Sequence, residues 1–305
     1  MNKMSRDRIA SELRRAMRES TKPSEIWRTL EKAGVLAVLF PTLDRATIVK
    51  AGRVEHHFEG SVFNHTMSVL DRMNKLCEDE DMDDEQRERR LWMALAHDIG
   101  KVIHADRVGG IHSDDPPTGF PDHASIGADH MSEVGRRLGL SAEIIGVMQD
   151  ACQKHMKFHD LPYMSPGELL DFLKNHQLDE TYLQNRATAW ELLDLAHADH
   201  EGRLKYDSDA GISRPSFDRE PYIESINAVG EANDSVEGYK ALETGLCVSH
   251  SGQDIDRTDG TFVESGESVS SVMERCEACR SPDSWVSDVM DSMRREIIMA
   301  ECDCT

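Results

Sequence analysis

Apolar residues recur at helical spacing along the first two thirds of the chain. Near the N-terminus, Ile9, Leu13, Ala16 and Met17 follow the i, i+4, i+7, i+8 pattern of an amphipathic helix over residues 6–20. The same kind of spacing predicts further helices over residues 23–33, 62–76, 91–98, 123–138, 142–155, 166–175 and 180–200. No alternating strand of convincing length occurs in this part. The pattern therefore predicts an all-α fold, a bundle of seven or more helices.

The pattern changes after residue 205. Residues 206–270 are rich in Ser, Gly, Asp and Glu and poor in periodic apolar residues, which predicts a flexible or irregular segment. One last helix is predicted over residues 285–299. We therefore expect three parts: an N-terminal helical segment, a main helical domain and a less regular acidic C-terminal extension. Their expected bounds are residues 1–45, 46–205 and 206–305.

Two polar segments interrupt the helical pattern. Residues 78–85 are almost entirely acidic, which is typical of a solvated connector. Residues 101–122 contain several Gly and Pro residues and predict a long loop. Loops of this length inside a compact domain are usually functional, so we expect this one to cover a substrate.

Composition limits the function classes. The chain has 35 Lys and Arg residues against 57 Asp and Glu residues, a formal net charge of −22. This charge argues against general DNA binding through a basic groove. The charged N-terminus shows no secretory signal, and the longest uncharged apolar run, residues 35–40, is too short to cross a bilayer. We expect no membrane association and a cytoplasmic location with reduced thiols.

The chemistry centres on the adjacent residues His97 and Asp98. They close the apolar helical run of residues 91–98, which we expect Gly100 to break. An imidazole and a carboxylate at a buried helix end are costly to desolvate unless a positive charge compensates them, and a divalent metal is the usual solution. By itself the dipeptide favours a hydrogen-bonded core histidine followed by a surface carboxylate, because two residues match by chance often.

Other residues of the types that bind metals lie on the apolar faces, or stripes, of other predicted helices. His65 lies between Val62 and Val69, and Asp199 follows Leu195 by four residues. Buried stripes rarely carry this many ionisable groups without a common partner. Any one of these histidines could instead be a satisfied core residue. As a set they predict a two-metal pocket with one bridging carboxylate, with the candidate ligands His65, His97, Asp98, His123, His155 and Asp199. We also expect His57, His104 and His159 near this pocket.

This ordered set resembles the HD superfamily of metal-dependent phosphohydrolases. The resemblance extends to the HD domain of bacterial CCA-adding tRNA nucleotidyltransferases and covers about residues 6–205. The motifs that carry it are Leu39-Phe40-Pro41-Thr42-Leu43-Asp44, His57-Phe58-Glu59-Gly60, His65-Thr66, Val69-Leu70-Asp71, His97-Asp98-Ile99-Gly100-Lys101, His123 with Gly127-Ala128, and Asp199-His200-Glu201-Gly202-Arg203. The nucleotidyltransferase head, with its Gly-Ser motif and paired Asp, has no counterpart, so we expect no nucleotide-adding activity.

The resemblance implies a role for each site residue. A first metal would be held by His65, His97, Asp98 and Asp199, and a second by His123 and His155, with Asp98 bridging. One or two divalent ions are expected, from among Mn, Fe, Ni, Co, Mg and Zn. Such an ion lowers the pKa of bound water toward about 7 for attack on phosphorus. Asp98 and Lys101 are the expected catalytic residues, although Lys101 could equally be a solvated cation at a helix end. Arg107 and Arg203 are the expected phosphate-binding residues.

These features predict a metal-dependent phosphohydrolase that acts on a phosphoester of a nucleotide or an RNA end, of the 2′,3′-cyclic phosphate or 2′-phosphate type. One alternative is a hydrolase of free or cyclic nucleotides in signalling or pool cleaning. Another is a non-catalytic regulatory module whose metal site only holds a ligand. The expected partners are a phosphorylated small molecule, a nucleotide or an RNA end.

A second, independent hypothesis concerns the C-terminal cysteines. Two close Cys pairs could form a four-thiolate structural zinc site. Its candidate ligands are Cys276, Cys279, Cys302 and Cys304.

Overall fold

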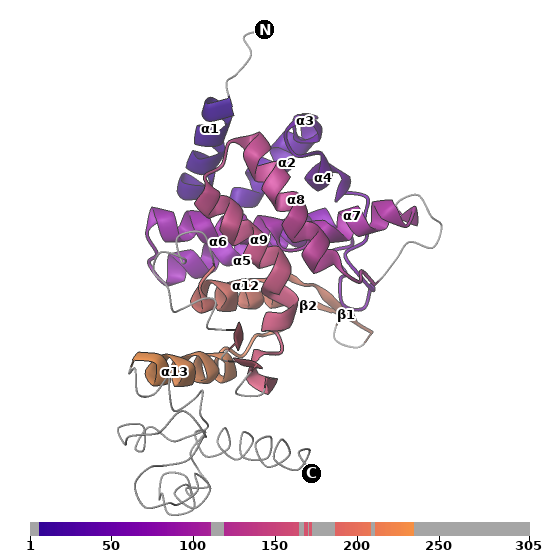
Figure 1. Cartoon of the computed structure of the whole chain (residues 1–305). Coiled ribbons are helices and arrows are strands. Elements are labelled where there is room, and N and C mark those ends of the chain that lie inside the picture. The colour runs from indigo at the N-terminus through magenta and orange to yellow at the C-terminus, as the bar shows by residue number, and fades with distance from the viewer. Residues whose placement is uncertain are drawn as a thin grey trace, which may run out of the picture. The chain divides into compact units, whose positions relative to one another are not determined.

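The computed structural model describes residues 6–110, 119–164, 168–169, 171–172, 187–208 and 211–234 (Figure 1). Contacts divide the chain into two units. The first unit comprises residues 1–159 and 180–219, and the second comprises residues 160–179 and 220–305. The described part is predominantly helical, which confirms the predicted all-α class. The domain bounds expected at residues 46 and 206 stay predictions.

Four helices form the N-terminal part of the first unit. They are α1 (Arg6–Glu19), α2 (Pro23–Lys32), α3 (Leu36–Leu39) and α4 (Pro41–Arg45). Pro23 and Pro41 stand in the first turn of α2 and α4, where the missing backbone N–H costs nothing. Helices α3 and α4 are short, with Phe40 between them. Trp27 of α2 packs edge-to-face on Trp92, with ring centroids 6.0 Å apart.

Six further helices lie in the described part of this unit. They are α5 (Val62–Asp79), α6 (Asp84–Ala96), α7 (Ile99–Arg107), α8 (His123–Leu138), α9 (Ala142–Phe158) and α12 (Ala189–Gly202). Side-chain oxygens cap the N-termini of four of them, from Ser61, Asp83, Ser141 and Thr188. The helices that pack most closely are α8 with α9, α12 with α5, α6 with α9, and α7 with α8. This arrangement brings α5, α6, α9 and α12 around one interior.

The break after the central apolar run differs from the prediction. Helix α6 ends at Ala96, and His97 and Asp98 form the turn between α6 and α7. Gly100 lies inside α7 and does not end a helix. The predicted loop over residues 101–122 is therefore wrong in its first part, because α7 continues to Arg107. Residues 111–118 lie outside the described part.

The region after residue 205 is also more regular than the composition indicates. Strands β1 (Lys205–Asp207) and β2 (Gly211–Ser213) pair antiparallel, with Tyr206 opposite Ile212. In the second unit, helix α13 (Glu220–Asp234) contacts the short 3₁₀ helix η2 (Leu161–Tyr163). The prediction of an irregular segment from residue 206 is thus wrong for β1, β2 and α13, whereas residues 214–219 form neither helix nor strand. The predicted helix over residues 285–299 and the four C-terminal cysteines lie outside the described residues.

Among the described residues, none of the helices has both the length and the apolar character needed to cross a membrane.

Candidate metal centre

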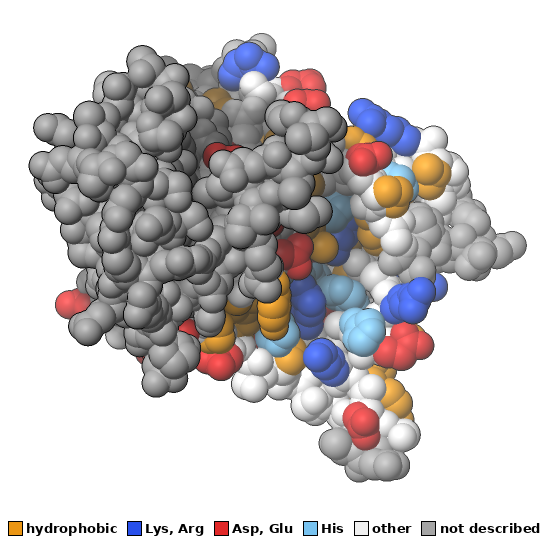
Figure 2. Space-filling view, turned by 60° about the horizontal axis from the view of Figure 1, so that its bottom comes forward, with side chains coloured by type: hydrophobic (Ala, Val, Ile, Leu, Met, Phe, Trp, Pro, Cys, Tyr) orange, Lys and Arg blue, Asp and Glu red, His pale blue; other side chains and the backbone are white. Residues whose placement is uncertain are grey.

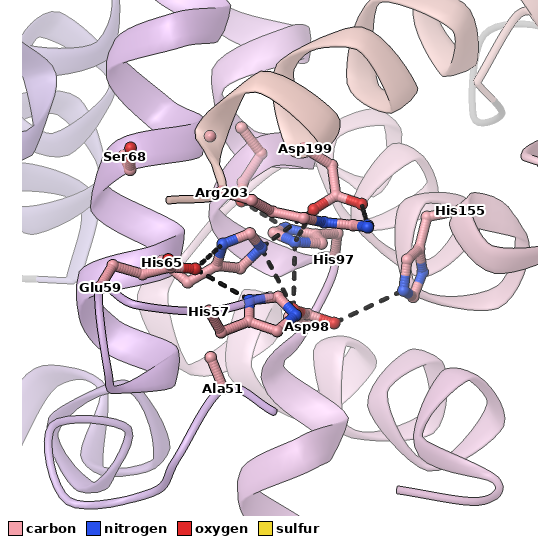
Figure 3. A network of polar contacts seen from close by, with 12 residues as sticks. Ala51, His57, Glu59, His65, Ser68, His97, Asp98, His155, Asp199 and Arg203 are labelled. Carbon is pink, nitrogen blue, oxygen red and sulfur yellow. Dashed lines mark hydrogen bonds and ion pairs between the residues drawn. The ribbon is translucent and has the colours of Figure 1, made fainter. Parts of the chain in front are cut away.

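Asp98 lies at the centre of a buried cluster of histidines and carboxylates (Figure 3). It stands in the turn between α6 and α7, so its side chain is held at the junction of two helices. Its two carboxylate oxygens face different histidine pairs. Oδ2 lies 3.5 Å from His65 Nε2 and 3.4 Å from His97 Nε2. Oδ1 lies 3.7 Å from His123 Nε2 and 3.5 Å from His155 Nε2.

The first donor group combines α5, the α6–α7 turn and α12. The ligand atoms of His65, His97 and Asp98 lie within 4.8 Å of one another. Asp199 of α12 joins this group, because its Oδ1 lies 3.0 Å from His65 Nε2 and 3.9 Å from His97 Nε2. All four side chains are buried.

The second donor group shares Asp98 and adds α8 and α9. The ligand atoms of Asp98, His123 and His155 also lie within 4.8 Å of one another. His123 is the first residue of α8 and His155 lies in the last turn of α9, so the close packing of these helices brings the two rings together. Their Nε2 atoms are 3.2 Å apart.

Hydrogen bonds on the outer side of each ring orient the histidines. Nδ1 of His97 donates to the Ala94 carbonyl at 2.9 Å, and Nδ1 of His123 donates to the Phe120 carbonyl at 2.7 Å. Nδ1 of His155 likewise contacts the carbonyls of Ala151 and Cys152. A carbonyl oxygen only accepts, so Nδ1 carries the proton in each ring, and in the neutral ring Nε2 presents a lone pair to the interior.

These orientations leave acceptors facing acceptors. The Nε2 lone pairs of His123 and His155 point toward each other and toward a carboxylate oxygen of Asp98. The buried Nε2 of His97 has no hydrogen-bond partner among the described residues. Buried acceptors need a positive partner, and imidazole with carboxylate is a donor set that divalent transition metals take. The cluster therefore fits one or two divalent metal ions.

Glu59 is a part of this site that the sequence analysis did not select. Its Oε1 lies 2.9 Å from Nδ1 of both His57 and His65, and its Oε2 accepts a hydrogen bond from the Leu204 backbone at 2.9 Å. A carboxylate on the outer nitrogen of a ligand histidine fixes the ring and makes it a better ligand. The only available signal was the motif His57-Phe58-Glu59-Gly60, since Glu59 lies before helix α5, outside any stripe.

The other carboxylate of the cluster, Asp199, is held by two further side chains. Arg203 Nη2 donates to Asp199 Oδ2 at 2.7 Å, and His159 Nε2 lies 3.2 Å from the same oxygen. The expected nearness of His57 and His159 to the cluster is thus confirmed. His104 instead packs on the ring of Phe120, with centroids 5.9 Å apart.

Lys101 lies in the first turn of α7, and its side chain is not solvated. Its ammonium donates to Asp98 Oδ2 at 2.7 Å and to the Ala51 carbonyl at 3.1 Å. Its side chain is only 12% exposed. The reading of Lys101 as a solvated cation is therefore wrong. Arg107 is the last residue of α7 and is exposed.

Four groups of the cluster have pKa values that their buried neighbours shift. Burial opposes a charge on His65, but hydrogen bonds to Asp199 and Glu59 outweigh burial and raise its pKa to about 9. Burial alone would raise the pKa of Asp98, yet Lys101 and His97 hold that pKa well below its usual range. The pKa of Asp199 is also held well below its usual range against burial, first by Arg203. Burial lowers the pKa of His123, which keeps that ring neutral.

Comparison with known proteins identifies this helical region. Residues 62–204 match the family model described as "HD domain". Residues 62–204 form an HD domain. The match begins at α5 and ends just after α12, so it includes His65, the His97–Asp98 pair and Asp199.

Curated relatives of this chain include proteins named "Multifunctional CCA protein". The one from Chromobacterium violaceum is 26% identical over 219 residues, which is 72% of this chain and 47% of the relative. The one from Alkalilimnicola ehrlichii is 27% identical over 216 residues, 71% of this chain and 47% of the relative. The one from Paracidovorax citrulli is 24% identical over 258 residues, 85% of this chain and 55% of the relative. The chain thus spans about half the length of these curated relatives.

Proposed function

We propose that this protein is a metal-dependent phosphohydrolase in which Asp98 bridges two divalent ions. The observation that carries the proposal is the orientation of the site: four imidazole Nε2 atoms point at the two oxygens of one buried carboxylate. In this assignment His65, His97 and Asp199 complete the first ion site, and His123 with His155 complete the second. The HD domain match supports the assignment.

Bound divalent ions supply two kinds of chemistry, since they polarise phosphoryl oxygens and lower the pKa of coordinated water. The chain itself supplies the geometry. The outer hydrogen bonds of the four histidines hold each ring in one orientation, and the Glu59 carboxylate does so for His65. A site that is held this firmly loses little entropy when the substrate binds.

Two cationic side chains are placed to receive the phosphoryl group. The Lys101 ammonium has three N–H groups, and its contacts with Asp98 and Ala51 use two of them. One N–H is left for the substrate. The Nε of Arg203 has no hydrogen-bond partner among the described residues, while its Nη2 is held by Asp199. We assign Lys101 to the charge that develops on the phosphoryl oxygens and Arg203 to substrate binding, since cationic donors stabilise such charge. Arg107, exposed at the end of α7, is proposed as a weaker contact.

We infer the substrate class from the likeness to these relatives. Proteins named "Multifunctional CCA protein" are about a quarter identical to this chain over 71–72% of its length. We therefore propose a phosphoester of a nucleotide or RNA end, of the 2′,3′-cyclic phosphate or 2′-phosphate type. The phosphorylated group would reach the metal centre, and the leaving group would remain outside it.

The test is a turnover assay on metal-stripped protein that is reloaded with Mn²⁺, Ni²⁺, Co²⁺, Fe²⁺, Mg²⁺ or Zn²⁺. Substrates are bis-p-nitrophenyl phosphate, 2′,3′-cyclic nucleotides, 2′-nucleotides and cyclic dinucleotides. We expect hydrolysis of the first three with at least one metal, and loss of at least a hundredfold in the double variant His97→Ala/Asp98→Ala.

The matched control is His56→Gln, because His56 is an exposed histidine outside the cluster. This variant should keep full turnover. Retained turnover in the double variant would refute the site. Metal bound at the cluster without turnover of any of these substrates would refute the enzymatic proposal and leave a metal-holding binding module.

A further inference from the structure

Two aromatic rings stack on the surface of the first unit. The rings of Phe58 and Tyr206 have centroids 5.4 Å apart and planes 21° from parallel. Phe58 is 40% exposed and Tyr206 is 53% exposed. Tyr206 belongs to the two-stranded β1–β2 hairpin, which has no third strand among the described residues to cover it. The pair therefore offers an apolar aromatic surface to solvent.

The backbone ties this pair to the metal centre. Phe58 is the residue between His57 and Glu59, whose side chains contact each other and His65. The Phe58 N–H donates to the Leu204 carbonyl at 2.8 Å, and the Leu204 N–H donates to Glu59 Oε2 at 2.9 Å. The two segments that carry the rings are thus joined beside the carboxylate that orients a metal ligand.

Two of the partly exposed members of the site lie on the same two segments, and others, such as Lys101 and His159, lie elsewhere. His57 directly precedes Phe58, and Arg203 precedes Tyr206 by three residues. The side chains of His57 and Arg203 are 12% and 26% exposed, whereas those of His65 and His97 are fully buried. On the face shown in Figure 2, histidine side chains (pale blue) lie beside Lys and Arg side chains (blue). Two side chains of the site that solvent reaches thus lie on the segments that carry the aromatic pair.

We propose that Phe58 and Tyr206 form a stacking platform for a nucleobase of the substrate. The inference rests on the proposed function and names its substrate class: nucleoside phosphoesters or RNA ends, in preference to base-free sugar phosphates. Every base presents a flat π-face, so an exposed aromatic surface binds bases with little regard to sequence. Arg203 and Lys101 receive the phosphoryl group while the base rests on the rings.

The first test reads binding directly and does not depend on turnover. The full chain with Tyr206→Trp is titrated in EDTA with adenosine 2′-phosphate and, in parallel, with ribose 5-phosphate. We expect saturable quenching of the introduced Trp by the nucleotide and none by the sugar phosphate. Adding Phe58→Ala should weaken the nucleotide affinity about tenfold. Tyr163→Trp, at a residue that is 87% exposed in the other unit, is the control and should show no saturable quenching.

The second test separates this proposal from the proposed function. In the metal-loaded enzyme, Tyr206→Ala should raise KM for a 2′,3′-cyclic nucleotide about tenfold with kcat little changed, and Tyr206→Phe should restore KM. Absence of turnover in the parent protein would contradict the proposed function alone, because the quenching test still reports on the platform. Equal quenching by nucleotide and sugar phosphate, no quenching by either, or an unchanged KM in Tyr206→Ala would overturn the platform. Self-association of the parent that Tyr206→Ala abolishes would assign the rings to a protein interface and would overturn it as well.

Discussion

Gly100 in α7 lies directly against the backbone of His123 in α8. A Cβ at Gly100 would be 1.8 Å from the His123 carbonyl oxygen, and it would also lie 2.9 Å from the backbone nitrogen of Gly127. No side chain fits such a gap without moving backbone. The absent side chain of Gly100 thus lets α7, which follows Asp98, and α8, which begins with His123, approach closely enough to share one cluster.

Gly100→Ala should separate these two helices. We expect a loss of about 1–3 kcal/mol in the free energy of unfolding, as for overpacked cores, measured by urea denaturation. Because the displacement moves His123 away from Asp98, we also expect the second metal to be lost before the first. Gly119→Ala is the control, since a Cβ there meets nothing within 4 Å, and it should leave both quantities unchanged.

Metal should stabilise the folded chain, because the cluster exists only when α5, α6, α9 and α12 are assembled. A ligand at a hundred times its Kd that binds only the native state adds about 2.7 kcal/mol. We expect a rise in Tm of about 5–10 °C on adding Mn²⁺ to metal-stripped protein, measured by calorimetry and reversed by EDTA. The same rise in Asp98→Asn would place the bound ion elsewhere.

Glu59→Gln should weaken metal binding without removing a ligand. The amide keeps the shape of Glu59 but removes the charge that faces Nδ1 of His65. Loss of such an outer carboxylate typically costs 10- to 100-fold in metal affinity, so we expect a loss of about that size in a titration with Mn²⁺. Glu55→Gln, at an exposed residue of the same loop, should bind Mn²⁺ like the parent. Equal Mn²⁺ affinities in the two variants would show that Glu59 does not support the metal site.

Glu191 gives a pH dependence of stability that is independent of the metal centre. Burial alone would raise its pKa, but the paired hydrogen bonds from Arg89, at 2.6 and 3.0 Å, outweigh burial and lower it. The folded pKa is therefore below the ordinary value near 4.5, so this stabilisation is fully present above that pH. It is lost as pH falls through the folded pKa.

Glu191→Gln tests that assignment, since Gln retains the capping box with Thr188 while the buried ion pair is broken. By urea denaturation we expect the free energy of unfolding of the variant to be about 3 kcal/mol below that of the parent at pH 7. The difference between variant and parent should be smaller below about pH 4. Glu143→Gln removes the charge of a more exposed partner of Arg89 and should lower the free energy of unfolding by less than about 1 kcal/mol. A difference for Glu191→Gln that does not shrink in acid would contradict the ion pair.

The apolar stripes predicted helices such as α8 and α9 and three members of the cluster. Helices α8 and α9 begin at His123 and Ala142, where they were expected. Apolar residues at helical spacing can be recognised from the local sequence alone. His65, His155 and Asp199 lie on such stripes, and all three are buried in the structure.

Other features depend on tertiary contacts, which the spacing of apolar residues along one helix does not reveal. Gly100 was expected to break a helix, but its role is tertiary, since it makes room for the His123 backbone. Glu59 lies in irregular backbone, where no period predicts the direction of a side chain. The β1–β2 hairpin carries only three residues in each strand, too few for an alternation to stand out from the surrounding polar composition.

The central claim is that Asp98 bridges two ions, and the most direct measurement is the number of Mn²⁺ ions bound per chain at saturation. Calorimetric titration of metal-stripped protein, checked by elemental analysis after gel filtration, should give two ions in the parent and at most one, weakly held, in Asp98→Asn. The far-ultraviolet circular dichroism of the variant should match that of the parent. No bound ion in the parent, or two ions in both proteins, would contradict the account.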